Sequence, residues 1–243
     1  MAASDIAARE PEHPNAGGFI RDIVFGANDG VVTAVGFLIG FAGAVSNQQT
    51  IIIAGVMQII AGGASMALGN YLAVKSQREF HDQMERVERW EMENKPEKEK
   101  DEIREIYTDM GFDHETVEIL TKKVTADKEL WLKVMMRDEL GFAQQENENP
   151  IFSGLVIGFF FLLGGLPPLL PFIFIHPVTL ALMCSFVAAV LVKVLIGYVR
   201  WVLNKGSLSR NITETVLIGV TAAAIGLGSS LVLKALGITG VTP

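Results

Sequence analysis

Five stretches of this chain are long and apolar enough to cross a lipid bilayer, and they constrain its fold more than any other feature. A helix needs about 20 predominantly apolar residues to cross the hydrocarbon core. We expect such helices at residues 23–45, 51–74, 151–175, 177–199 and 216–233. The third stretch is expected to break near its end, at Pro167, Pro168 and Pro171, and the fifth is the shortest. The sequence therefore predicts an all-α membrane protein with five transmembrane helices.

Charged residues are concentrated between the second and third stretches. Residues 75–148 hold 21 of the 27 acidic and 13 of the 20 basic side chains, a net charge of −8 against −7 for the whole chain. Such a segment attracts cations and repels nucleic acid, so no nucleic-acid partner is expected. Cys184 is the only cysteine, which excludes a disulfide framework and a cysteine-based zinc cluster.

The loop charges predict the orientation in the membrane. Lys and Arg are enriched in cytoplasmic loops, and here they precede the first stretch and follow the second and the fourth. The N-terminus and the acidic segment are therefore expected in the cytosol, with the C-terminus on the far side. We divide the chain into an N-terminal cytosolic segment (1–19), two membrane helices (20–75), a cytosolic acidic domain (76–149) and three further membrane helices (150–243).

Small residues recur at four-residue spacing in the apolar stretches. They are Gly26 and Gly30, Gly36 and Gly40, then Ala222, Gly226 and Ser230. Such faces let helices approach closely in lipid. The pattern fits a homodimer with an ion path between protomers, and it fits equally well tight packing within one protomer.

Asp29 is the most informative residue of the first stretch. A carboxylate in a membrane span is costly and by default indicates an ion or proton path. The alternative is that Asp29 lies near the interface, hydrated or paired with Arg21. Met66 in the second stretch offers a thioether, which suits a transition metal better than Ca²⁺ or Mg²⁺, although methionine also commonly fills space. Lys193 is expected to extend its ammonium to the cytosolic interface.

The acidic domain is predicted to hold three to four helices. The second membrane helix should continue into the cytosol until Asn94, because no Gly or Pro interrupts it after residue 70. A second helix is expected over residues 96–110. Asp113 should cap a short helix to about residue 124, and Asp127 another to about residue 145.

Acidic residues on these helices recur at three-residue steps and should form carboxylate ridges. The ridges are Glu85, Glu88 and Glu91, then Glu99, Glu102 and Glu105, with Met135, Met136, Asp138 and Glu139 on the last helix. Carboxylates with thioethers suit Fe²⁺ or a similar transition metal. The alternative is an ordinary solvated face, in which Glu85 pairs with Arg89 and Lys98 with Glu102.

Three strings in the sequence resemble the vacuolar iron transporter family of plants, fungi and parasites. They are RDIVFGANDG at 21–30, ASMALG at 64–69 and MMRDELG at 135–141. The resemblance implies a homodimer of five-span protomers in the vacuolar membrane that exchanges cytosolic Fe²⁺ for vacuolar protons. It also implies a membrane metal site from Asp29 and Met66 of both protomers. The cytosolic site would comprise Glu88, Glu91, Glu99, Glu102, Met135, Met136 and Glu139. Many relatives carry Glu where this chain has Asn70, so a second carboxylate is missing there.

The expected function is therefore proton-coupled transport of Fe²⁺, with Mn²⁺, Co²⁺ and Zn²⁺ as further candidate cargoes. Lipid, metal ions and protons are the expected partners. We expect neither an enzyme nor a prosthetic group, and no P-loop pattern indicates ATP-driven pumping. One alternative is a membrane-anchored di-iron oxidase, but none of the three histidines beyond the N-terminal segment (His81, His114 and His176) follows a Glu at the Glu-x-x-His spacing. The other is a metal sensor that transports nothing.

Overall fold

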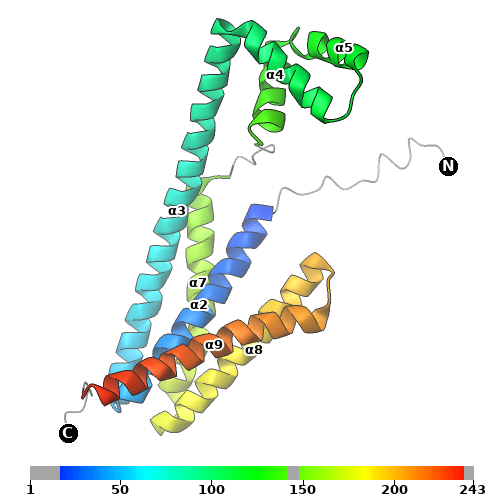
Figure 1. The fold of residues 1–243 in the computed structure, drawn as a ribbon. Helices are drawn as coiled ribbons and strands as arrows, with labels where there is room; N and C mark the ends of the chain where they lie inside the picture. Colours follow the sequence, from blue (N-terminus) through cyan, green and yellow to red (C-terminus); the bar gives the residue numbers. More distant parts are fainter. Residues whose placement is uncertain (1–16, 142–147, 238–243) are drawn as a thin grey trace, which may run out of the picture. The chain divides into compact units, whose positions relative to one another are not determined.

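The computed structural model describes residues 17–141 and 148–237, and within these ranges the chain contains helices and no strand. The helices, shown in Figure 1, are α2 (Gly17–Ala44), α3 (Gln48–Asn94), α4 (Pro96–Asp109), α5 (His114–Val124), α6 (Lys128–Val134), the π-helical turn η1 (Met135–Glu139), α7 (Pro150–Phe174), α8 (Val178–Asn204) and α9 (Leu208–Ala235). The described chain divides into two compact units. The membrane unit contains the residues up to Tyr71 and from Asn149 onward, and the acidic unit contains Leu72–Glu148.

Five helices, α2, α3, α7, α8 and α9, are long and apolar enough to cross a membrane, as the sequence predicts. The prediction that the fifth span is the shortest is wrong. α9 begins at Leu208, ahead of the apolar stretch, and its 28 residues exceed the 25 of α7. The mainly polar residues 208–215 form about its first two turns, in which Thr215 Oγ1 donates to the Asn211 carbonyl.

The predicted break in the third span is also wrong, because α7 remains helical through Pro167, Pro168 and Pro171. In lipid, a broken helix would leave backbone polar groups without partners. Side chains outside α7 supply hydrogen bonds to its proline-containing end. Ser185 Oγ donates to the Pro168 carbonyl at 2.6 Å. Gln48 Nε2 donates to the Phe172 carbonyl at 2.6 Å and to that of Ile175, which follows the helix, at 2.8 Å.

Glycines bring α2 into close contact with α7 and α9 (Figure 1). A Cβ at Gly30 would lie 2.1 Å from the Phe161 carbonyl oxygen of α7. A Cβ at Gly226 of α9 would lie 2.1 Å from the Gly36 oxygen. Of the two interpretations of the small-residue pattern, tight packing within one protomer is the one observed.

Lys193 does not reach the interface, contrary to the sequence prediction. Its side chain is 1% exposed, and Nζ donates to the Oδ1 of Asn28 at 2.6 Å and to the Asn28 carbonyl at 3.2 Å. α8 continues to Asn204, so Lys193 lies about 16 Å along the helix from its C-terminal end. Asn28 satisfies the ammonium inside the helix bundle.

The helices of the acidic unit follow the sequence prediction except for the last. α3 is continuous to Asn94, and the carboxylates of Asp113 and Asp127 cap α5 and α6 by accepting backbone N–H bonds. The sequence predicts that the last helix reaches about residue 145, but the helical run ends at Glu139 in the turn η1, and Gly141 adopts a positive φ of 68°. Such a backbone favours glycine and ends a helix. Residues 142–147 lie outside the described part of the chain.

We predict that the substitution Gly226→Ala destabilises the membrane unit, because its methyl group would collide with the backbone of α2. Overpacking of this kind typically costs about 1–3 kcal/mol. The melting temperature in detergent should therefore fall by roughly 5 °C. Gly228→Ala on the same helix is the matched control, because no atom lies within 4 Å of its added Cβ. Equal melting temperatures for the two variants would contradict the packing described above.

Candidate metal centre

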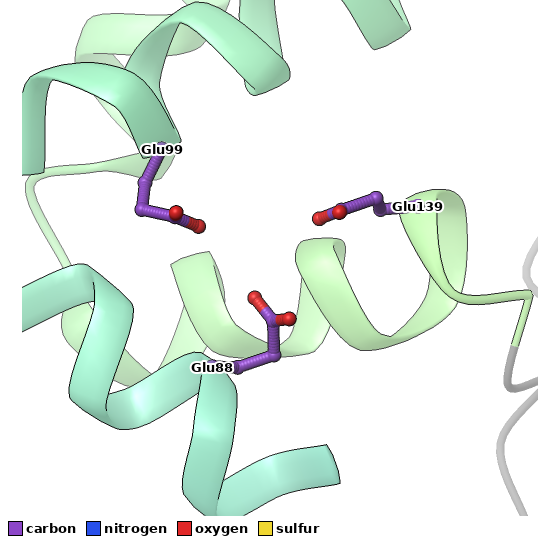
Figure 2. A group of neighbouring side chains, drawn as sticks. All are labelled: Glu88, Glu99 and Glu139. Carbon is purple, nitrogen blue, oxygen red and sulfur yellow. The ribbon is translucent and has the colours of Figure 1, made fainter. Parts of the chain in front are cut away.

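Three glutamates from separate helical segments come together in the acidic unit. Figure 2 shows the carboxylates of Glu88, Glu99 and Glu139 directed toward one another. One oxygen of each lies within 4.8 Å of one oxygen of the others. Two oxygens on opposite sides of a divalent ion, each bound at 2.0–2.4 Å, are about 4 to 5 Å apart. This carboxylate cluster therefore has the dimensions of a cation site.

The hydrophobic core of the acidic unit positions the cluster. Glu88 and Glu99 each lie one helical turn before a buried residue, Met92 on α3 and Ile103 on α4. Residues four apart share a helix face, so the faces that enter the core also carry these carboxylates. η1 contributes Glu139. Its wider turn is closed by the hydrogen bond from Leu140 N to the Met135 carbonyl at 3.2 Å, a helix variant that is frequent at functional sites.

Burial leaves several cluster oxygens without partners. Glu99 is fully buried and Glu88 is 4% exposed, whereas Glu139 is exposed. Both carboxylate oxygens of Glu99 and the Oε2 of Glu88 accept no hydrogen bond from any described residue. A buried carboxylate without partners is strongly disfavoured. These oxygens therefore need a proton or a cation.

The electrostatics of the cluster lead to the same conclusion. The apolar part of α3 ends near Val74, so Glu88 lies outside the membrane-spanning part of that helix. Burial, with added repulsion from Glu139, raises the pKa of Glu88 to about 7. Burial, with added repulsion from Glu102, raises the pKa of Glu99 to about 7. The pKa of Glu139 is also raised, chiefly because its carboxyl is partly desolvated although the residue as a whole is exposed, with added repulsion from Glu102.

Glu91 and Glu102, also predicted as site residues, flank the cluster and are engaged with lysines. Lys95 Nζ lies 2.9 Å from Glu91 Oε1, and this hydrogen bond lowers the pKa of Glu91. Lys98 Nζ lies 2.6 Å from Glu102 Oε1. Both carboxylates repel the cluster glutamates. Metal binding by either residue would require it to leave its lysine.

Other glutamates of the carboxylate ridges form ordinary ion pairs on a solvated helix face, which is the alternative stated in the sequence analysis. Glu85 accepts hydrogen bonds from Arg89 at 3.0 and 3.1 Å, as that alternative predicts, and Arg89 also binds Glu129. The Lys98–Glu102 pair also forms as predicted. The helix surface thus combines ordinary ion pairs with one cluster of buried carboxylates.

Met135 and Met136 lie in the core of the acidic unit. Met135 is fully buried and Met136 is 7% exposed, and both pack with Met92, Ile103 and Trp131. Both methionines belong to η1, the turn that also carries Glu139. The structure gives these methionines a packing role.

Asp29 and Met66 are both half-buried, on α2 and α3. Arg21 forms an ion pair with Asp22 at 3.2 Å, so the proposed pairing of Arg21 with Asp29 is not the arrangement observed. Among the described residues, Asp29 accepts no hydrogen bond that would fix its carboxylate, and its electrostatic partner is Lys193. The sequence interpretation did not assign Lys193 to this site.

Asp22 is a second acidic residue that the sequence interpretation did not single out. It is 2% exposed and accepts a short hydrogen bond from Ser153 Oγ, which in turn accepts one from Asn70 Nδ2 at 2.7 Å. These bonds link α2, α7 and α3. Asp22 lies seven residues before Asp29, on the same helix face, and that spacing was the available signal. Asn70, the departure from the family pattern, therefore acts as a hydrogen-bond donor here.

Known proteins resemble this chain over nearly its whole length. Residues 20–230 match the VIT family. Vacuolar iron transporter 1 of Eucalyptus grandis is 31% identical over 220 residues, which cover 89% of this chain and 87% of the relative. Vacuolar iron transporter 1 of Oryza sativa subsp. japonica is 31% identical over 230 residues, covering 93% and 90%. Protein CCC1 of Saccharomyces cerevisiae is 27% identical over 223 residues, covering 90% and 69%.

These matches confirm the resemblance identified from the three sequence strings. They also confirm the prediction that the chain is not an enzyme, because the family is one of transporters. The chain belongs to the VIT family.

Proposed function

We propose that this protein transports Fe²⁺ from the cytosol across the vacuolar membrane in exchange for protons, and that its acidic unit collects the ion on the cytosolic side. The observation that carries this proposal is the cluster of Glu88, Glu99 and Glu139 in a membrane protein of the VIT family. Relatives about 30% identical over about 90% of the chain are named vacuolar iron transporters, which supports the cargo and the membrane. The loop charges support a cytosolic N-terminus and acidic unit.

The acidic unit serves as the collecting site in this proposal. Carboxylates are hard ligands and thioethers are soft ones, and together they suit a borderline ion such as Fe²⁺, with Mn²⁺, Co²⁺ and Zn²⁺ as competitors. A divalent ion would neutralise the repulsion among the cluster glutamates. Glu91 and Glu102, with Met135 and Met136, are the further ligands that the family resemblance implies.

Asp29 and Met66 form the passage site in the proposal, and a homodimer completes it. One protomer offers a single carboxylate and a single thioether there, fewer donors than a transition metal takes. Two protomers would double the set. The small-residue faces of α2 and α9 are occupied within the protomer, so the contact between protomers would use other faces.

The two alternative functions, a di-iron oxidase and a metal sensor that transports nothing, receive less support. A di-iron oxidase needs histidine beside its carboxylates, and among the described residues the carboxylate cluster contains only glutamates. A sensor that transports nothing gives no role to Asp29 in a membrane span.

Metal binding to the full-length protein should tighten as the pH rises from 6.0 to 7.5. A carboxyl whose pKa is raised to about 7 is mostly protonated at pH 6, so an ion must displace the protons of Glu88 and Glu99. The Kd for Mn²⁺, measured by titration calorimetry in detergent, should fall by about tenfold or more over this range, with protons released. The same shifts mean that, without metal, the free energy of unfolding falls as the pH rises from about 4.5 to about 7.

The variant with Glu88, Glu99 and Glu139 all changed to Gln should lose both the tight binding and most of its pH dependence. Glu93, Glu97 and Glu115 are exposed acidic residues of the same unit, so their triple change to Gln is the control for loss of charge. An equal effect of the two triple variants would show that the cluster is an ordinary acidic surface.

The substitution Asp29→Asn should slow Fe²⁺ uptake into inside-acid proteoliposomes by about tenfold or more, because it removes the only carboxylate proposed for the passage site. Uptake is measured with an iron-sensitive dye trapped in the vesicles under anaerobic conditions. Asp109→Asn, the same chemical change at an exposed position of the acidic unit, should leave the rate unchanged. Uptake by the Asp29 variant at the rate of the unsubstituted protein would exclude this path.

A further inference from the structure

Lys193 is a buried cation that the proposed transport path does not yet use. It lies in the middle of α8 and is 1% exposed. Its ammonium donates two hydrogen bonds to α2, and both acceptors belong to Asn28, the residue before Asp29. A lysine inside a membrane span is costly and is expected to face the helix bundle and pair with an opposite charge.

The neighbouring helices α9 and α2 provide space and hydrogen-bond acceptors for the Lys193 side chain. On α9, the buried Gly219 lies against the lysine stem, and a Cβ there would come within 3.2–3.6 Å of Lys193 Cε, Cγ and Cδ. The absence of a side chain at Gly219 gives the stem its space. The hydrogen bonds to Asn28 then fix the ammonium at the level of Asp29 on α2.

Asp29 is the negative charge that attracts this ammonium. Asn28 supplies neutral acceptors, and Coulomb attraction acts between Lys193 and Asp29. Asp22, the other acidic residue of α2, is bound by Arg21 and Ser153. Among the described residues, Lys193 and Asp29 thus interact through Coulomb attraction, while the hydrogen bonds of the ammonium go to Asn28.

We propose that Lys193 is a tethered counter-cation that competes with the transported metal for Asp29. A divalent ion at Asp29 would be repelled by the lysine charge in surroundings of low dielectric constant, where charges act on one another more strongly than in water. Lys193 thus weakens metal binding at this position and promotes release of the ion. It acts through Asp29 as a positioning residue, and the inference rests on the proposed role of Asp29 in transport.

The test compares variants of the full-length protein in lipid nanodiscs, with Glu88, Glu99 and Glu139 changed to Gln to silence the acidic unit. Mn²⁺ is the probe, and free Mn²⁺ is followed by electron paramagnetic resonance. Lys193→Met removes the charge and keeps the length of the stem, so it should bind Mn²⁺ about tenfold or more tightly than the parent. Lys193→Arg keeps the charge and should bind within about threefold of the parent.

The combination with Asp29→Asn separates the counter-cation role from a structural one. If Lys193 acts through Asp29, Lys193→Met should leave Mn²⁺ affinity unchanged when Asp29 is already Asn. An unchanged affinity for Lys193→Met with Asp29 present, or an equal gain without it, would overturn the inference. Where Lys193→Met fails to fold, Lys193→Gln replaces it, since its amide can still donate to Asn28.

One further result is diagnostic of the proposed function itself. If Asp29→Asn alone leaves Mn²⁺ binding unchanged in the silenced background, Asp29 is not a metal contact. That result overturns both the passage site and the counter-cation role. If Asp29→Asn abolishes Mn²⁺ binding but Lys193→Met has no effect, only the counter-cation role is overturned.

Discussion

Repulsion among the carboxylates of Glu88, Glu99 and Glu139 is the interaction on which the acidic unit depends. One oxygen of each lies within 4.8 Å of one oxygen of the others, and two of the three side chains are buried. The core around Ile103 and Met135 holds them there despite the cost, since the same helix faces carry both the apolar residues and the acids. Protons or a divalent cation can relieve the repulsion, and this choice links metal binding to pH.

The membrane unit meets a different constraint, the need to satisfy polar and charged groups away from water. Glycines bring α2 against α7 and α9 so closely that an added methyl group would overlap backbone atoms. This packing allows Lys193 of α8 to reach Asn28, and it places Ser153 against Asp22. The polar groups near Asp29 are thus held by neighbouring helices of the same protomer.

Sequence patterns predicted the features that depend on local chemistry. The five membrane helices, the continuation of α3 to Asn94 and the caps at Asp113 and Asp127 all follow from hydrophobicity, breakers and capping residues. The features that the sequence predicts wrongly depend on tertiary contacts. Prolines stay within α7, Lys193 is buried, and η1 ends the last acidic helix early. No spacing rule could show which three of the many glutamates would meet, because they come from segments that only folding brings together. Their roles, and those of Asp29 and Met66, remain predictions.

The central claim is that a proton gradient drives Fe²⁺ through this protein. The most direct measurement uses proteoliposomes with equal Fe²⁺ concentrations inside and outside, an acidic interior and no membrane potential. Under proton-coupled exchange, Fe²⁺ should accumulate inside to a higher concentration than outside while protons leave, and accumulation should stop when a proton ionophore dissipates the pH difference. Fe²⁺ that stays at equal concentrations while the pH gradient persists would contradict the claim.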